Sequence, residues 1–191
     1  VGCGPRGGFV PFLRDEGYDA LGVDPKAPDE PGYVQAKVED AELPDKVDAV
    51  IACTSLHHVE EPAQVIERVA DLLARGGTLV VVEWAWEEFD TQTAEWAFER
   101  LLTSDDPGWL ERRRDGWRAS GEDWQRYLHS WAEEHGLHRA MKLVPLLDAA
   151  GRPAHVVVGE GSRVAQVLGS ADHGVAVLAR RLVAHAGVQA Q

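Results

Sequence analysis

Cysteine is scarce in this chain of 191 residues, which contains two, and basic residues are scarce beside acidic ones, 19 against 32. Two cysteines are too few for a disulfide scaffold, so a reducing, cytoplasmic location is expected. The net charge of −13 repels a phosphate backbone, so nucleic acid is not an expected partner. No apolar run approaches the roughly 20 residues that a membrane-spanning helix needs, and no membrane association is expected.

Several catalytic and binding motifs are also missing. The chain has no Gly-x-Ser-x-Gly sequence, which argues against a serine hydrolase. Its histidines are not spaced with cysteines as metal ligands are, so no metal is expected. What is present is a chain of one-domain length in which 45% of the residues are hydrophobic, enough to form a core.

The two ends of the chain differ in character from its middle. The chain begins at Val1, directly before a glycine-rich loop that normally follows a buried strand, so we expect most of a first strand to be missing. Residues 151–191 contain no aromatic residue, and their four arginines outnumber their two acidic residues. We therefore expect a main domain at 1–150 and a C-terminal segment of uncertain structure at 151–191.

Apolar patterning predicts alternating strands and helices. Near-continuous apolar runs, which are typical of strands covered on both faces, alternate with stretches of helical periodicity. The expected strands span 19–24, 33–38, 47–53 and 78–82, with weaker candidates at 154–158 and 175–178, and the expected helices span 9–14 and 60–77. In the longer helix, Pro62 marks the start and Gly76 and Gly77 mark the end. Such alternation predicts an α/β fold with an open, mostly parallel sheet.

Tryptophan is confined to one stretch, since all seven lie between Trp84 and Trp131. Helical patterning covers 91–147, and one helical face carries Trp124, Tyr127, Leu128 and Trp131. Ser120 is a candidate cap for this helix. The aromatic face has two interpretations at this point: core packing, or a wall against a planar or apolar small molecule.

A glycine loop at the start of the chain carries the strongest chemical signal. The spacing Gly2-x-Gly4-x-x-Gly7 is typical of loops that bind dinucleotides, and Asp24 follows Gly4 by 20 residues. A carboxylate at that distance accepts hydrogen bonds from both hydroxyl groups of a ribose. Dehydrogenases and methyltransferases share this arrangement, so the loop alone leaves the choice between a nicotinamide and a methyl-donor cofactor open.

Further motifs, in the same order along the chain, resemble the class I S-adenosylmethionine-dependent methyltransferases of the small-molecule type. The matching segments are VGCGP at 1–5, LGVD at 21–24, EDAELP at 39–44, TSLHHV at 54–59 and RGGTLVVVE at 75–83. The resemblance implies a Rossmann-like α/β fold, with a doubly wound, mostly parallel sheet and a helical, tryptophan-rich segment after the fifth strand. It also implies an enzyme that transfers a methyl group from S-adenosylmethionine to a small molecule. The acceptor and the oligomeric state stay open.

The resemblance assigns cofactor binding to eight residues. They are Gly2, Cys3, Gly4, Asp24, Glu39, Asp40, Cys53 and Thr54. By the resemblance, the glycines let the methionyl moiety approach, and Asp24 binds the ribose hydroxyls. Asp40, with Glu39 as the fallback, accepts a hydrogen bond from the adenine amino group. Cys53 and Thr54 line the floor of the cofactor site.

A histidine pair, His57 and His58, supplies a candidate base for the same reaction. A hydroxyl acceptor gains from a histidine that takes up its proton, and His57 is placed first, with Glu83 as a further candidate. The Leu-His-His-Val segment also has a plain structural interpretation, as the lead into the following helix. The sequence leaves both interpretations open.

The sequence departs from the family pattern at two positions, and two alternative functions stay open. The acidic residue that family members carry two positions before the first glycine is not in this sequence, and Arg6 stands where many members have glycine. An NAD(P)-dependent oxidoreductase is the enzymatic alternative, but neither Tyr33 nor Tyr127 has a lysine four residues later. The other alternative is a non-catalytic family member that binds the cofactor or a partner protein without turnover.

Overall fold

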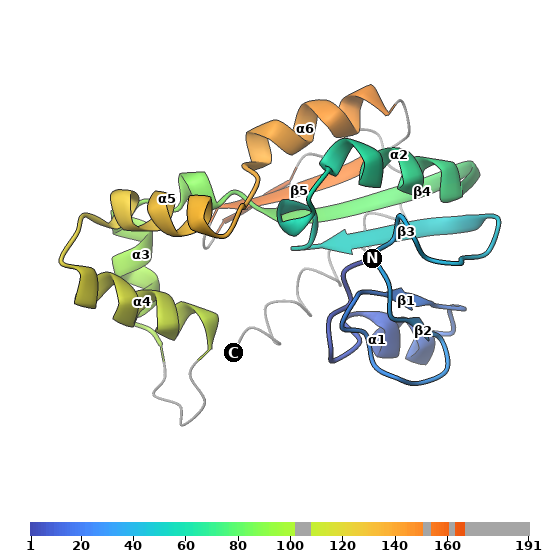
Figure 1. The fold of residues 1–191 in the computed structure, drawn as a ribbon, viewed down its shortest axis with the longest axis horizontal. Helices are drawn as coiled ribbons and strands as arrows, with labels where there is room; N and C mark the ends of the chain where they lie inside the picture. The colour runs from blue at the N-terminus through green and yellow to red at the C-terminus, as the bar shows by residue number, and fades with distance from the viewer. Residues whose placement is uncertain (102–107, 151–153, 161–162, 167–191) are drawn as a thin grey trace.

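The computed structural model describes residues 1–101, 108–150, 154–160 and 163–166 (Figure 1). The strands are β1 (Gly22–Val23), β2 (Tyr33–Val34), β3 (Val47–Cys53), β4 (Leu73–Trp84), β5 (Ala154–Glu160) and β6 (Arg163–Gln166). The α-helices are α1 (Val10–Asp15), α2 (Pro62–Leu72), α3 (Thr91–Phe98), α4 (Trp109–Ser120), α5 (Trp124–Glu134) and α6 (Ala140–Ala149). Two short 3-10 helices, η1 (Leu56–His58) and η2 (Trp86–Glu88), follow β3 and β4.

The larger sheet has the strand order β3-β4-β5-β6, in which β3, β4 and β5 are parallel and β6 is antiparallel. Cys53 lies opposite Val82, so the carboxyl ends of β3 and β4 meet at one edge of the sheet. Helices α2 and α6 cover one face of this sheet (Figure 1). The parallel α/β arrangement is therefore confirmed. In such folds, ligands bind outside the carboxyl ends of the strands, and here the loops after β3 and β4 lie at that edge.

The strands do not form the single continuous sheet that was expected. β1 and β2 pair in parallel as a separate two-stranded sheet. Val1 and Gly2 lie between the two sheets: the Val1 nitrogen donates to the carbonyl oxygen of Ile51 on β3, at 2.8 Å. The Gly2 N–H donates to the carbonyl oxygen of Val23 on β1, also at 2.8 Å. Two residues bridge the sheets but are too few for a ladder of strand pairing.

One apolar face determines where helix α2 lies. Pro62 opens the helix, where its missing N–H costs no hydrogen bond. The buried face carries Val65, Ile66, Val69 and Leu72, each at most 5% exposed. Leu143 and Leu147 of α6 join the same core, so the two helices pack together over the sheet.

The prediction that this helix runs to Gly77 is wrong. Helix α2 ends at Leu72, whereas Leu73 is extended, pairs with Val47 of β3 and is 1% exposed. Gly76 has a positive φ of 82°, but it lies within β4 and not at a helix end. Burial of the Leu73 side chain in the core outweighs the local glycine signal.

Other strand predictions differ in their bounds. The expected strand at 47–53 is confirmed, while those at 19–24 and 33–38 are each reduced to two residues. β5 confirms the candidate at 154–158 and pairs with β4, so the larger sheet continues past residue 150. The candidate at 175–178 lies outside the described residues.

Helices α3, α4 and α5 enclose a second core, in which half of the buried side chains are aromatic. Trp124 and Leu128 of α5 are 0% exposed, and Trp86 of η2 is 1% exposed. The core-packing interpretation of the α5 face is therefore confirmed for Trp124 and Leu128. Asp123, and not Ser120, caps α5, because its carboxylate accepts the N–H of Gln125 at 3.0 Å.

Candidate functional site

The glycine loop turns sharply between the two sheets. Gly2 and Gly4 have φ angles of 72° and 61°, in the left-handed region that favours glycine. A Cβ on Gly2 would overlap the Ser55 side chain, which follows β3. A Cβ on Gly4 would meet no atom of the described residues within 4 Å. The loop is thus closely packed at Gly2 and leaves open space beside Gly4.

Asp24 follows β1 and faces this loop. One carboxylate oxygen, Oδ2, accepts the backbone N–H of Gly4 at 3.0 Å, and Oδ1 accepts the N–H of Lys26 at 2.7 Å. Each carboxylate oxygen has two lone pairs, so, counting partners among the described residues, one acceptor position remains on each. The half-buried Asp24 carboxylate can therefore accept two further hydrogen bonds beside the open space at Gly4.

The residues after β3 combine backbone strain with an unpaired hydroxyl. Thr54 has a φ of 46°, which costs a β-branched residue on the order of 1–3 kcal/mol, and its N–H donates to the Val82 carbonyl oxygen at 2.6 Å. The buried Oγ atom of Ser55 has no hydrogen-bond partner among the described residues. Strain and unsatisfied polar atoms of this kind concentrate at binding sites. Sequence reasoning missed Ser55, because nothing local indicates its contact with Gly2.

The two cysteines line the same region as neutral thiols. Burial raises the pKa of Cys53 to about 11 and also raises the pKa of Cys3 above its usual range. Both cysteines are free and half-buried. They therefore contribute small, uncharged surface, and the place of Cys53 in the floor of a cofactor site stays a prediction.

Glu39 and Asp40 occupy a turn after β2. Glu39 is half-buried and Asp40 is exposed. The adjacent Lys37 pairs with Glu60 at 2.9 Å, which ties this turn to the segment that follows η1. The turn is thus linked to the segment after η1, while the choice between the two acidic residues stays open.

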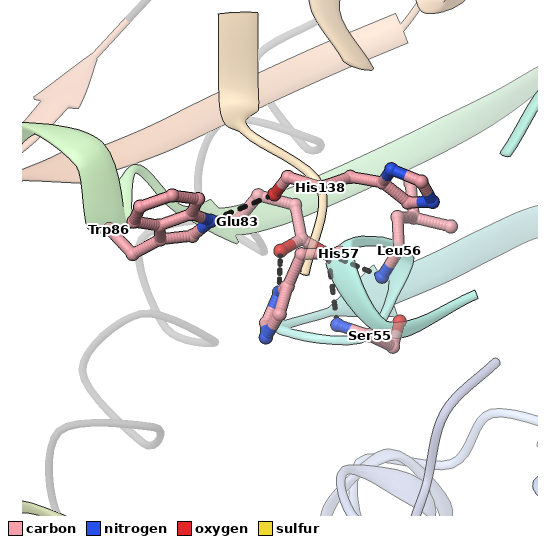
Figure 2. Close-up of polar contacts among 6 residues, drawn as sticks. All are labelled: Ser55, Leu56, His57, Glu83, Trp86 and His138. Atoms are coloured by element: carbon pink, nitrogen blue, oxygen red, sulfur yellow. Dashed lines mark hydrogen bonds and ion pairs between the residues drawn. The ribbon is translucent and has the colours of Figure 1, made fainter. Parts of the chain in front are cut away.

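A buried carboxylate, Glu83, organises the loop that begins η1 (Figure 2). It is the penultimate residue of β4 and is 3% exposed. Its Oε1 atom accepts the backbone N–H groups of Ser55 and Leu56, at 2.9 and 2.6 Å. Its Oε2 atom lies 2.5 Å from Nδ1 of His57, whose side chain is buried as well. Glu83 therefore holds both the backbone of this loop and the His57 ring.

A second contact to η1 comes from the loop between α5 and α6. The His138 N–H donates to the His57 carbonyl oxygen at 2.9 Å, and Nε2 of its ring donates to the Val59 carbonyl oxygen at 2.8 Å. The indole N–H of Trp86 donates to the His138 carbonyl oxygen at 3.0 Å (Figure 2). This loop joins the aromatic helical core to the candidate site. Sequence reasoning did not identify His138, which lies far from η1 along the chain.

The pH dependence of stability offers a test of the histidine environment. Burial, with the neighbouring ring of His57 next, lowers the pKa of His58 below its usual 6.5; His135 adds to the lowering and Glu83 opposes it. The unfolded chain therefore binds a proton here at a pH where the folded protein does not, and stability falls as pH drops below about 7. Between pH 7.5 and 5.5, roughly the range over which histidine titrates, we expect the melting temperature of the His58→Asn variant to fall by less than that of the wild type. Parallel declines in the two proteins would contradict this environment.

Comparisons with known proteins place these features in a family. Searches of curated proteins and of solved structures each gave no significant match. Within the described ranges, no helix has the length and apolar character needed to cross a membrane, and no three potential ligand side chains group as a metal site. A family model described as a methyltransferase domain matches residues 1–151, most of the chain. The chain therefore belongs to the methyltransferase-domain family, of the class I S-adenosylmethionine-dependent type with a Rossmann-like α/β fold.

Proposed function

We propose that this protein transfers a methyl group from S-adenosylmethionine to a small-molecule acceptor. The observation that carries the proposal is the Asp24 carboxylate, which holds the Gly4 N–H and keeps an acceptor position on each oxygen beside open space. A ribose presents two adjacent hydroxyl donors, which match the two remaining positions. Membership of the methyltransferase family favours this cofactor over a nicotinamide.

The residues present fit such a cofactor. The open space that the described residues leave at Gly4 would admit the methionyl moiety. Cys53 and Thr54 would form the floor, with Asp40 or Glu39 at the adenine amino group. When bound, S-adenosylmethionine supplies an electrophilic methyl group on a positively charged sulfur.

His57 is the proposed base for the acceptor. It follows β3 at the carboxyl edge of the sheet, and its side chain is largely buried, with 6% exposed. An acceptor hydroxyl bound beside it would pass its proton to the imidazole as the oxygen becomes methylated. The strong negative charge of the chain favours a small-molecule acceptor over nucleic acid.

The finer fold expectation is part of the same proposal. We infer that β1–β2 and β3–β6 act as one doubly wound Rossmann-like unit, because Val1 and Gly2 hydrogen-bond to strands of both sheets. The cofactor would then lie across the junction, as ligands do where strand order reverses in such sheets. A cytoplasmic location stays a prediction from the low cysteine content.

Calorimetric binding of S-adenosylhomocysteine, with NAD as the competing cofactor, tests the proposal. We expect binding of the former alone, weakened roughly 100-fold or more by Asp24→Ala, because two hydrogen bonds to a charged group contribute about 1.5–3 kcal/mol each. The matched control is Asp29→Ala, which changes an exposed aspartate between β1 and β2. A folded wild-type protein that binds neither ligand would refute the assignment, and NAD binding would replace it with the oxidoreductase.

A further inference from the structure

We propose that Glu83 is a positioning residue that holds His57 with its Nδ1 atom protonated and its Nε2 atom free to accept a proton. The inference rests on the proposed methyl transfer and deepens it, since it restricts the acceptor to molecules with a proton to lose at the methylated atom. A hydroxyl-bearing small molecule is the acceptor class that needs such a base. The evidence for this role is the set of contacts that the buried Glu83 carboxylate makes.

The orientation of the Glu83 carboxylate is determined by the backbone. Two N–H groups, those of Ser55 and Leu56, converge on Oε1. Backbone N–H groups only donate, so Oε1 must be the accepting oxygen for both. Oε2 is consequently directed at the imidazole of His57 (Figure 2). Because both side chains are almost fully buried, water does not compete for this contact.

The contact determines which ring nitrogen carries the proton. An ionised carboxylate accepts hydrogen bonds and cannot donate them, so Nδ1 of His57 is the donor. In the neutral ring, Nε2 then presents a lone pair, and it has no hydrogen-bond partner among the described residues. The ring of His58 lies 4.1 Å away between centroids, and His138 approaches through its backbone N–H, which binds the His57 carbonyl oxygen. Among the described side chains, only that of Glu83 forms a hydrogen bond with the His57 ring, and it accepts that bond.

The chemistry of the transfer balances at this pair. The proton of the acceptor hydroxyl moves to Nε2 of His57, and the acceptor oxygen forms the new bond to the methyl carbon. The carbon–sulfur bond breaks, and its electron pair stays on sulfur. His57 becomes a cation, and the Glu83 carboxylate at Nδ1 stabilises that charge.

The variant Glu83→Gln separates positioning from folding. The amide oxygen can still accept the Ser55 and Leu56 N–H groups, but the amide nitrogen then faces Nδ1 of His57. Since an amide nitrogen only donates, Nδ1 must become the acceptor, and the proton moves to Nε2. We expect two-bond nitrogen–proton NMR spectra of histidine-labelled protein to show the Nδ1–H form in the wild type and the Nε2–H form in this variant. The His57 signals are assigned by their loss in His57→Gln.

The matched control is Glu87→Gln, the same change in a glutamate that accepts a backbone N–H, that of Met141, outside the site. It is expected to leave His57 in the Nδ1–H form. An Nε2–H form in the wild type, or an unchanged form in Glu83→Gln, would overturn the inference; if that variant fails to fold, the wild-type spectrum decides. S-adenosylhomocysteine binding is measured on the same samples: its absence from folded wild type refutes the proposed function, whereas the spectra test the Glu83–His57 pair independently.

Discussion

Replacing Trp124 by alanine is expected to lower the free energy of unfolding by about 3–5 kcal/mol, the usual cost of removing a fully buried aromatic side chain. The Trp124 ring is 0% exposed and packs edge-on against Phe89 and Phe98, with centroids 5.3 Å apart in both pairs. Trp117 lies 5.4 Å away in the same arrangement. One substitution therefore removes the central ring of the aromatic core that joins α3, α4 and α5.

The hydrogen bond of the indole adds a smaller contribution. The Trp124 N–H donates to the Phe89 carbonyl oxygen at 2.6 Å, but Gln125 also donates to that oxygen, at 3.0 Å. The carbonyl therefore keeps a partner in the variant, and most of the cost comes from the cavity. Urea denaturation followed by circular dichroism measures the change. Trp96→Ala is the control, because Trp96 is 47% exposed and is expected to cost less than about 1 kcal/mol; equal costs at both sites would refute this account of the core.

Replacing Gly4 by alanine is expected to weaken S-adenosylhomocysteine binding by at least about 100-fold, or about 2.8 kcal/mol. Gly4 has a φ of 61°, and its Cβ position lies in open space, so the methyl group would occupy volume assigned to the cofactor. In the part of the chain that the structure describes, no atom within 4 Å opposes that methyl group, and the expected cost to folding is a backbone strain of roughly 1–2 kcal/mol. Calorimetry and thermal melting separate the two effects.

Gly121 provides a matched control for this substitution. It follows α4 with a φ of 67°, and its Cβ position is also free of atoms within 4 Å. Gly121→Ala should therefore impose a similar strain on the fold while leaving cofactor binding unchanged. If Gly4→Ala binds S-adenosylhomocysteine as the wild type does, the cofactor does not lie against this loop.

Local pattern was sufficient for several elements of the fold. The strand at 47–53 was predicted with its observed bounds from its short, near-continuous apolar run. The expectation that both of its faces are covered was wrong, because β3 ends the strand order of its sheet and, of its seven residues, only Val50 and Ala52 are buried. The buried face of α2 was predicted correctly too, from its helical spacing. The end of α2 was predicted wrongly, because Leu73 pairs with Val47, a residue remote in sequence, and so belongs to the sheet.

The candidate site divides in the same way. Gly2, Gly4 and Asp24 were predicted from glycine spacing and from the distance to the next acidic residue, and the structure brings Gly4 and Asp24 into direct contact. Cofactor binding by these three residues, and by Cys3, Glu39, Asp40, Cys53 and Thr54, stays a prediction, as does the role of His57 as a base.

By itself, the sequence determined the parallel α/β character, the glycine loop and the acidic residue that faces it, because each depends on neighbours along the chain or on a set spacing. Tertiary structure alone decided that Ser55 abuts Gly2, that Glu83 holds His57 and that His138 binds the same loop. It also decided that Trp124 packs in a core. The His57–Glu83 contact joins residues 26 positions apart, and the His138 ring reaches Val59 across 79 positions. Such contacts depend on how strands and helices pack in space, and no periodicity or spacing in the sequence encodes them.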